Sequence, residues 1–261
     1  MKLVINADDY GKDENATLAI AESFRHGFIT QTTLMTNMPW AEKAIEIAKK
    51  NGTESRIGLH ITLSEGLPLT TKIRKLPKFC HKDGTFIKDG FRSNVWTQYT
   101  AEEQVALKEE LEAQIQRYID FKLPLMHCDG HHHSHIWLPV YRVLSPLLAK
   151  YGFKSVRKSV DAPWESLLHP RIYGWSMDAF RHFITPPNVR LVDHFGSVEF
   201  FEKRRNHFGR RSSVEIMVHP RFNEKDELVD FKSVDGRLMS DVLASVIEGS
   251  PLLCTYAEVC Q

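Results

Sequence analysis

Short apolar runs alternate with amphipathic stretches from one end of the chain to the other. Residues 3–7 (LVINA) form a short run that is typical of a buried strand. Residues 14–26 carry apolar side chains at helical spacing, and Gly27 follows as an expected C-terminal cap. The same reasoning predicts further strands at 30–36, 56–63, 125–129, 155–158, 214–218 and 252–257, and helices at 40–50, 100–121, 139–151 and 237–247.

The helix at 100–121 has the strongest pattern, because Thr100 and Glu103 form a capping box at its start. In two segments the apolar residues follow neither helical nor strand spacing. Residues 64–98 mix Gly, Pro, Lys and aromatic residues, which predicts a loop-rich excursion that could lie over a site. Residues 161–212 are expected to be irregular.

Alternating strands and helices indicate a parallel α/β protein. A chain of 261 residues is in the range of a single α/β barrel, and 42% hydrophobic residues can fill a sizeable core. There is no internal repeat, low-complexity segment or change of composition that would mark a linker. We therefore expect one domain over residues 1–261.

The charge balance and the N-terminal sequence limit the partners and the location that we expect. Lys and Arg number 34 and Asp and Glu number 33, so we expect no nucleic-acid partner. The opening apolar run is too short for a secretory signal, and no stretch approaches the ~18 apolar residues of a membrane span. We expect no membrane association and a cytoplasmic location. The cysteines form no C-x-x-C pair, and Cys128 is expected to be a small buried hydrophobe.

Polar residues gather where the predicted strands end. Asp8 and Asp9 follow the first strand, His60 lies toward the end of the third, and His219 follows residues 214–218. In α/β folds, ligands bind at the carboxyl ends of the strands, so this placement predicts a site. The richest group follows the strand at 125–129 and contains Asp129, His131, His132, His133 and His135.

The Asp8-Asp9 pair has two interpretations. At the end of a strand both side chains can turn toward one cavity, where their repulsion favours a nearby cation. The alternative is a turn or helix cap, since D-D-Y-G before a helix is good capping chemistry.

The histidine run indicates metal binding or catalysis, because neutral imidazole is a common ligand of divalent metals. Its alternating H-x-H pattern predicts that imidazoles share one face of an extended segment. The alternative of an expression tag is disfavoured, because a tag would be terminal. His60 alone is more often a hydrogen-bonded core residue, and Glu215 is expected to be structural or a supporting partner of the site.

One carboxylate and two histidines would leave open positions on a metal for water and substrate. The metal would lower the pKa of the water and polarise a carbonyl. A second carboxylate could take the proton, and a histidine could give one to the leaving group. This set of residue types suits hydrolysis of an amide or ester.

Five motifs together carry a family resemblance. They are N-A-D-D-Y-G at 6–11, T-Q-T-T-L-M-T-N at 30–37, G-L-H-I-T-L at 58–63, H-C-D-G-H-H-H-S-H at 127–135 and V-H-P at 218–220. In order and spacing the chain resembles the YdjC-like carbohydrate deacetylases, the chitooligosaccharide deacetylase family, over essentially its whole length. The resemblance implies an α/β fold, a single-domain distorted (β/α) barrel like those of glycoside hydrolases and deacetylases. It also implies metal-dependent removal of acetyl groups from small N-acetylated sugars, and often a homodimer.

Carried over by position, the resemblance implies that Asp9, His60 and His131 bind the metal. It implies that Asp8 is the general base and His219 the general acid or oxyanion partner. It implies one divalent ion, usually magnesium, although two imidazoles chemically favour zinc or another transition metal. Further residues that could contact substrate or support the site are His133, His135, Arg157 and Glu215.

The chain departs from the family pattern at Gly130, where the family usually has serine, and also at Cys128 and Ser134. Trp96, Trp137 and Trp164 could stack on sugar rings or pack in the core.

Two other functions stay open. A phosphoesterase on a similar barrel would need basic side chains at the strand ends, where only Arg157 and Arg221 are found. A sugar- or metal-binding protein without activity would not need both Asp8 and Asp9.

Overall fold

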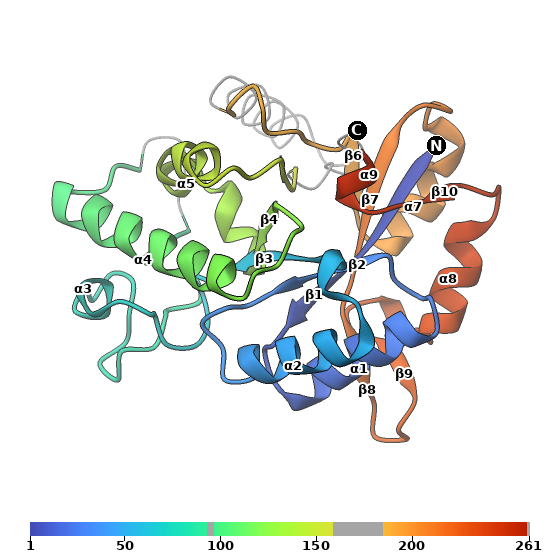
Figure 1. Cartoon of the computed structure of the whole chain (residues 1–261), viewed down its shortest axis with the longest axis horizontal. Coiled ribbons are helices and arrows are strands. Elements are labelled where there is room, and N and C mark those ends of the chain that lie inside the picture. Colours follow the sequence, from blue (N-terminus) through green and yellow to red (C-terminus); the bar gives the residue numbers. More distant parts are fainter. Residues whose placement is uncertain (93–96, 159–184, 260–261) are drawn as a thin grey trace.

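A curled parallel β-sheet forms the centre of the molecule, which we describe from a computed structural model for residues 1–92, 97–158 and 185–259 (Figure 1). Its strands follow the order β5-β4-β3-β2-β1-β7-β6, so β1 lies near the middle. Every pairing in this sheet is parallel. The strands are β1 (Lys2–Tyr10), β2 (Gln31–Leu34), β3 (Ile57–Ile61), β4 (His127–Gly130), β5 (Ser155–Val156), β6 (His194–Gly196) and β7 (Ser213–Val218).

The two edges of this sheet are linked by one segment. Arg190 forms a parallel bridge with Ser155, and the Val156 N–H donates to the Arg190 carbonyl at 3.0 Å. A few residues later the same segment becomes β6, which pairs with β7. The sheet therefore curls into a distorted barrel. A short strand, β10 (Leu252–Leu253), pairs with the beginning of β1.

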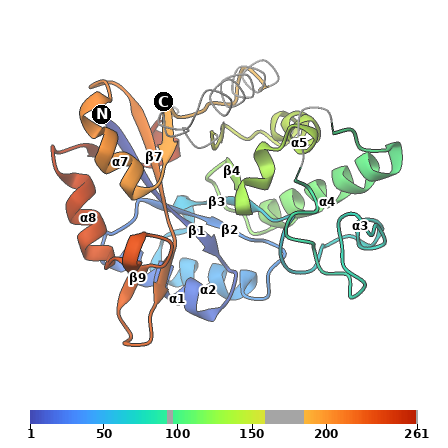
Figure 2. The ribbon, with the colours of Figure 1, turned by 180° about the vertical axis from the view of Figure 1, so that it is seen from behind.

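Helices cover the outside of the curled sheet (Figures 1 and 2). In both views α1 and α2 lie together on one side, while α4 and α5 lie side by side on another. A separate antiparallel hairpin, β8 (Pro220–Phe222) and β9 (Leu228–Asp230), packs next to α1. The described helices are α1 (Glu14–Arg25), α2 (Ala41–Asn51), α3 (Thr71–Arg74), α4 (Ala101–Asp120), α5 (Leu138–Lys150), α7 (Val198–Arg204), α8 (Met239–Ile247) and α9 (Tyr256–Val259).

The alternation of side chains along β1 separates the apolar core from the polar interior. Leu3, Ile5 and Ala7 join the large cluster that packs the sheet against the helices. Asn6 and Asp8, which alternate with them, point to the inside of the barrel and are also buried. The carboxyl ends of the strands therefore enclose polar side chains that must find partners among themselves.

The predicted α/β barrel is confirmed, and so is the capping box of Thr100 and Glu103 at the start of α4. The predicted strand at 252–257 is wrong beyond residue 253. There the Thr255 N–H and hydroxyl both donate to Glu258, at 2.6 and 2.9 Å, and start the short helix α9. Within the irregular region 161–212, β6 and α7 were not predicted, and residues 159–184 lie outside the described part.

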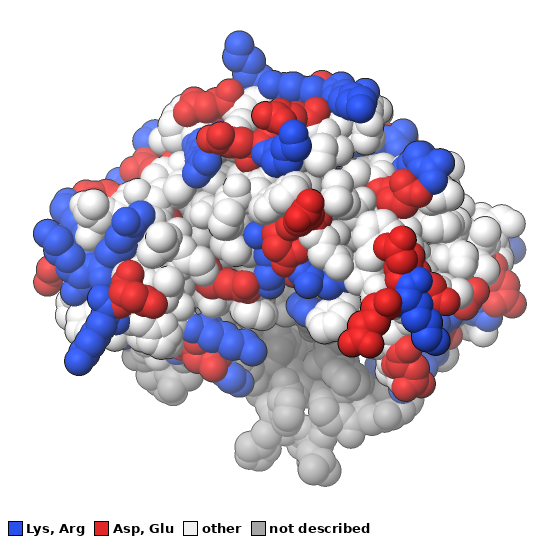
Figure 3. Space-filling view, turned by 90° about the horizontal axis from the view of Figure 1, so that it is seen from below, with Lys and Arg blue, Asp and Glu red and all other residues white. Residues whose placement is uncertain are grey.

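In the part of the chain that the structure describes, none of the helices has the length and apolar character needed to cross a membrane. The face shown in Figure 3 carries acidic and basic side chains interspersed with one another. Cys80, Cys128 and Cys254 are buried free thiols, and Cys260 lies outside the described residues. The expectation that Cys128 is a buried hydrophobe is therefore confirmed, because it packs in the main core.

Candidate active site

An irregularity at the end of β1 brings Asp8 and Asp9 to the same side of the sheet. The register between β1 and β2 shifts between Ala7 and Tyr10, and Asp9 has a left-handed φ of 74°. In a regular strand the two neighbouring side chains would point to opposite faces. The irregularity turns both carboxylates into the barrel, at the cost of an unfavourable backbone conformation that is common at functional sites.

Asp9, His60 and His131 form a buried cluster of the type that binds a metal, and we call it the metal-type cluster. The Asp9 Oδ1 atom lies 2.8 Å from His131 Nδ1 and 3.4 Å from His60 Nε2. Asp9 Oδ1 and His60 Nε2 nevertheless have no partner with hydrogen-bond geometry. Buried polar atoms without partners are costly, and a divalent cation between one carboxylate and two imidazoles would satisfy them. The residues present therefore fit a divalent metal ion.

A second carboxylate backs each imidazole of this cluster. His60 Nδ1 lies 2.6 Å from Asp129 Oδ1, and His131 Nε2 lies 2.8 Å from Glu65 Oε2. Lys12 Nζ holds the same Glu65 oxygen at 2.8 Å. A carboxylate on the far nitrogen fixes the tautomer of a histidine and leaves the other nitrogen for a metal.

The protonation of His60 reflects this arrangement. Burial would lower the pKa of His60, but the Asp129 carboxylate outweighs burial and raises it to about 10. In the metal-free protein a proton on His60 therefore supplies positive charge to the cluster.

Arg157 lies at the centre of the barrel interior and joins three carboxylates. Its Nη1 and Nη2 donate to the two oxygens of Asp8 at 2.7 and 2.6 Å, and Nε donates to Glu215 Oε1 at 2.8 Å. Nη2 also lies 2.7 Å from Asp129 Oδ2. The guanidinium packs against the Phe195 ring and is completely buried. Arg157 therefore connects Asp8 to the carboxylate that orients His60.

This environment sets the charge of Asp8. Burial would raise the pKa of Asp8, but the Arg157 guanidinium outweighs it and holds the pKa well below its usual range. Asp8 Oδ1 also accepts a hydrogen bond from Asn6 at 2.7 Å, while Oδ2 faces His219 Nε2 at 3.9 Å. Asp8 is therefore ionised and rigidly held, with Oδ2 turned toward His219.

His219 is positioned by the β8–β9 hairpin. It stands between β7 and β8, and its backbone N–H donates to Asp230 Oδ1 at 2.8 Å. Burial lowers the pKa of His219 to about 4, so its imidazole is neutral near pH 7.

The histidine run is not the extended segment that the H-x-H pattern predicted. Residues His131–Ile136 form a 3₁₀ turn in which His132 and His133 have left-handed φ values of 50° and 55°. The turn gives the consecutive imidazoles different partners. His131 joins the metal-type cluster, His132 accepts or donates a hydrogen bond with Ser64 at 2.9 Å, and His133 packs edge-on against Phe195.

Close packing beneath this turn explains the glycine at its start. A Cβ atom on Gly130 would lie only 2.9 Å from His135 Nδ1, and the other end of that imidazole contacts the Arg157 carbonyl at 3.2 Å. His135 is therefore buried under the turn and supports the segment that carries Arg157.

Two other groups of donor atoms could in principle hold a metal: Asp8 with His60 and Asp129, and His127 with Asp129 and Glu215. In both groups Arg157 already supplies the positive charge to the carboxylates. The Asp9 cluster differs, because the basic side chain nearest to Asp9 Oδ2 is Lys12 at 3.8 Å. This difference favours the cluster expected from the sequence.

The aspartates and histidines singled out at the predicted strand ends lie in or around one site, although their chemical roles stay predictions. Arg157 and Glu215 are both buried and are hydrogen-bonded to each other. The sequence reasoning did not assign roles to Glu65, Asn6 or Thr33, which donate or accept hydrogen bonds in the same network. The strand-end position of Asp129 was the one available signal for its role.

The fold and site together define an α/β barrel with an Asp/His metal-type cluster at the carboxyl ends of its strands. Residues 2–245 match the family model described as YdjC-like protein, and the chain belongs to this family. A relative from Halalkalibacterium halodurans named carbohydrate deacetylase is 30% identical over 249 residues, which cover 91% of this chain and 92% of the relative. A relative of the same name from Clostridium beijerinckii is 31% identical over 222 residues, covering 84% and 81%.

Among solved structures, the chain is similar to a protein from Enterococcus faecalis V583 that has been named as a candidate for cellobiose-phosphate cleavage. The TM-score is 0.74 at 21% sequence identity, and the match covers 100% of this chain and 99% of the other. At this identity the likeness shows a common fold.

The buried position of Arg157 leads to a prediction about stability. Arg157→Met keeps the length of the side chain and leaves three buried carboxylates without their cation. We expect it to lower the free energy of unfolding by about 3–5 kcal/mol, measured by urea denaturation. Arg117→Met, which removes an exposed ion pair with Glu42, is the matched control and should cost at most about 1 kcal/mol. Equal stability of the two variants would contradict the central role of Arg157.

Proposed function

We propose that this chain is a metal-dependent hydrolase that removes acetyl groups from N-acetylated carbohydrates such as chitooligosaccharides. The observation that carries the proposal is the buried Asp9–His60–His131 cluster, with Asp8 and His219 beside it. The relatives named carbohydrate deacetylase support it, since they align with more than four fifths of the chain.

Asp9 Oδ1, His60 Nε2 and His131 Nδ1 would hold one divalent ion. When bound, this ion would lower the pKa of a water molecule and polarise the acetyl carbonyl. Asp129 and Glu65 keep the two imidazoles oriented for this purpose. The family leads us to expect magnesium, while the two nitrogen donors favour zinc or another transition metal.

Asp8 is proposed as the general base. The attacking water must lose a proton while its oxygen bonds to the acetyl carbon, and Asp8 Oδ2 is the carboxylate oxygen that faces His219. Because Arg157 holds the pKa of Asp8 low, this residue is ionised and ready to accept a proton, but it is a weak base on its own. The lowered pKa of the water would compensate for this weakness.

His219 is proposed as the oxyanion partner. Its imidazole is neutral near pH 7, and a neutral ring carries one N–H that can donate to the carbonyl oxygen as negative charge develops there. The departing amine needs a proton when the C–N bond breaks. Asp8 would supply this proton, which it took from the water. Its Oδ2 atom lies 3.9 Å from His219 Nε2.

The alternative functions fit the site less well. A phosphoesterase needs basic side chains free to bind phosphate, but Arg157 is enclosed by carboxylates and Arg221 is paired with Asp13. In an inactive binding protein Asp8 would serve only as the partner of Arg157, and its Oδ2 would have no reason to face His219. The single domain over residues 1–261, the cytoplasmic location and the homodimer stay predictions.

The proposed function predicts metal-dependent release of acetate. Protein stripped with EDTA should release no acetate from N,N′-diacetylchitobiose, and activity should return when one divalent metal is added back. Separate additions of magnesium, manganese, cobalt and zinc would rank the metals. Bound metal without acetate from any N-acetylated sugar would contradict the deacetylase proposal.

Separate variants should distinguish the base from the metal ligands. Asp8→Asn should keep metal affinity near that of the wild type but lower kcat by about 10²–10⁴-fold, because the proton acceptor is lost. His131→Ala should lose both metal and turnover. Thermal unfolding must be measured in parallel, because Asp8 also pairs with Arg157. Near-normal turnover by a folded Asp8→Asn variant would show that the assigned base is wrong.

The carboxylates behind the imidazoles should control metal affinity. Glu65→Ala removes the partner of His131 Nε2 and should weaken metal binding about 10–100-fold, measured by isothermal titration calorimetry. Glu65→Gln keeps an acceptor oxygen and should lose less. Glu46→Ala, an exposed change on α2, is the control. Tighter binding by Glu65→Ala would mean that Glu65 competes with the metal for His131.

A further inference from the structure

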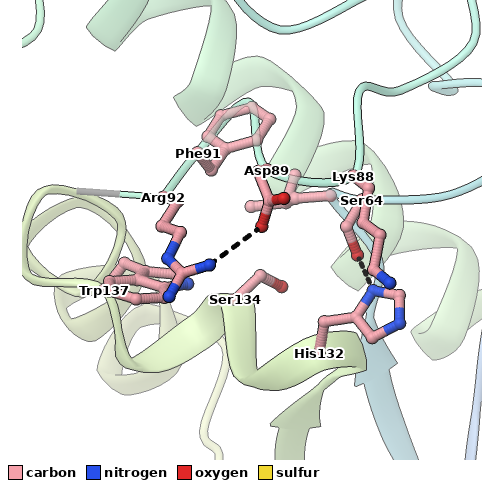
Figure 4. Close-up of a pocket in the computed structure, with 9 residues that line it drawn as sticks. Ser64, Lys88, Asp89, Phe91, Arg92, His132, Ser134 and Trp137 are labelled. Atoms are coloured by element: carbon pink, nitrogen blue, oxygen red, sulfur yellow. Dashed lines mark hydrogen bonds and ion pairs between the residues drawn. The ribbon is translucent and has the colours of Figure 1, made fainter.

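A separate pocket lies next to the histidine turn, and Figure 4 shows the residues that line it. Residues 63–64 and 88–92 form one wall, and the histidine turn with Trp137, the residue before α5, forms the other. Ser64 and His132 connect the pocket to the cluster, because His132 follows the cluster residue His131 and Ser64 precedes Glu65, the partner of His131. The His131 and His132 rings are 4.0 Å apart between centroids.

The pocket has the mixed lining that a sugar ring requires. The lining includes the apolar side chains of Trp137, Phe91 and Leu63 and the charged side chains of Lys88, Asp89 and Arg92. One face of a pyranose consists of C–H groups that pack on aromatic rings, and its edge carries hydroxyls that donate and accept hydrogen bonds. Arg92 lies over the Trp137 ring and pairs with Asp89 at 3.6 Å, so donors and acceptors stand next to the aromatic surface.

Ser134 provides an independent indication of a ligand. Its side chain is buried, with 2% of the residue exposed, yet its hydroxyl has no hydrogen-bond partner. Figure 4 shows this hydroxyl directed into the space between Asp89 and His132. A buried hydroxyl without a partner is uncommon, and a hydroxyl of a bound ligand would satisfy it.

The size of the pocket limits what it can hold. Its volume is about 250 Å³, which is below the about 300–1,000 Å³ of sites for drug-sized ligands. This space suits one sugar ring rather than a chain of several.

On these grounds we propose that the pocket is a subsite for the sugar unit next to the one that carries the reacting acetyl group. The inference rests on the proposed function and deepens it, because it assigns the recognition of the second sugar unit to particular residues of this chain. Ser134 and Trp137 are then specificity-determining residues. Of the tryptophans considered from the sequence, Trp96 and Trp164 lie outside the described residues.

The test compares acetate release from N,N′-diacetylchitobiose and from N-acetylglucosamine. Ser134→Ala and Trp137→Ala should each lower the ratio of kcat/KM for the disaccharide to that for the monosaccharide by about tenfold, mainly through KM. Trp137→Phe should restore most of the ratio. Asp226→Asn, at the tip of the β8–β9 hairpin, is the matched control and should leave it unchanged.

A ratio that stays at the wild-type value in both variants would overturn the subsite. Ser134→Ala removes a hydroxyl without a partner, so it should fold even if Trp137→Ala does not. Equilibrium titration with chitobiose and glucosamine, which carry no acetyl group, separates this failure from that of the proposed function. Wild-type protein that binds chitobiose more tightly than Ser134→Ala supports the subsite even if no acetate is released, and equal binding overturns it.

Discussion

The buried guanidinium of Arg157 is the interaction on which the barrel interior depends. It holds Asp8 with two hydrogen bonds, and it neutralises Asp129 and Glu215 from the same position. Asp129 in turn orients His60. A single charged side chain therefore fixes both the proposed base and one proposed metal ligand, and their geometry cannot be changed separately. Removing one member of such a buried network costs far more than removing a surface pair.

The charge balance of the interior explains why this fold suits a cation. Asp8, Asp9, Asp129 and Glu215 are all buried. Arg157 is the permanently charged partner of all of these except Asp9. Burial raises the pKa of Glu215 to about 7, and the Asp129 carboxylate raises that of His60 to about 10. The protein thus uses protons to reduce negative charge. A divalent ion bound by Asp9 would do the same, and its binding energy would stabilise the folded chain.

The sequence predicted much of this arrangement, because strand ends can be located from apolar runs and the carboxyl ends of parallel strands meet at one edge. It could not predict pairings between distant segments, such as Arg157 with Asp8 across 149 positions or Glu65 with His131 across 66. Glu65 lies in the excursion at 64–98, where apolar residues follow no regular spacing. The local sequence therefore gave no sign that Glu65 belongs to the site. The prediction of an extended histidine run was wrong, because His132 and His133 have left-handed backbone conformations that do not continue a strand.

The same left-handed turn joins the metal-type cluster to the neighbouring pocket. Each left-handed residue of this kind costs about 1–3 kcal/mol and persists only where its surroundings impose it. Here His132 and His133 adopt this conformation, so that His131 faces the cluster while His132 and Ser134 face the pocket. At the start of the same turn Gly130 packs closely on His135, and His135 contacts the Arg157 backbone. The network around Arg157 therefore extends from the proposed catalytic residues to the pocket that would bind the second sugar unit.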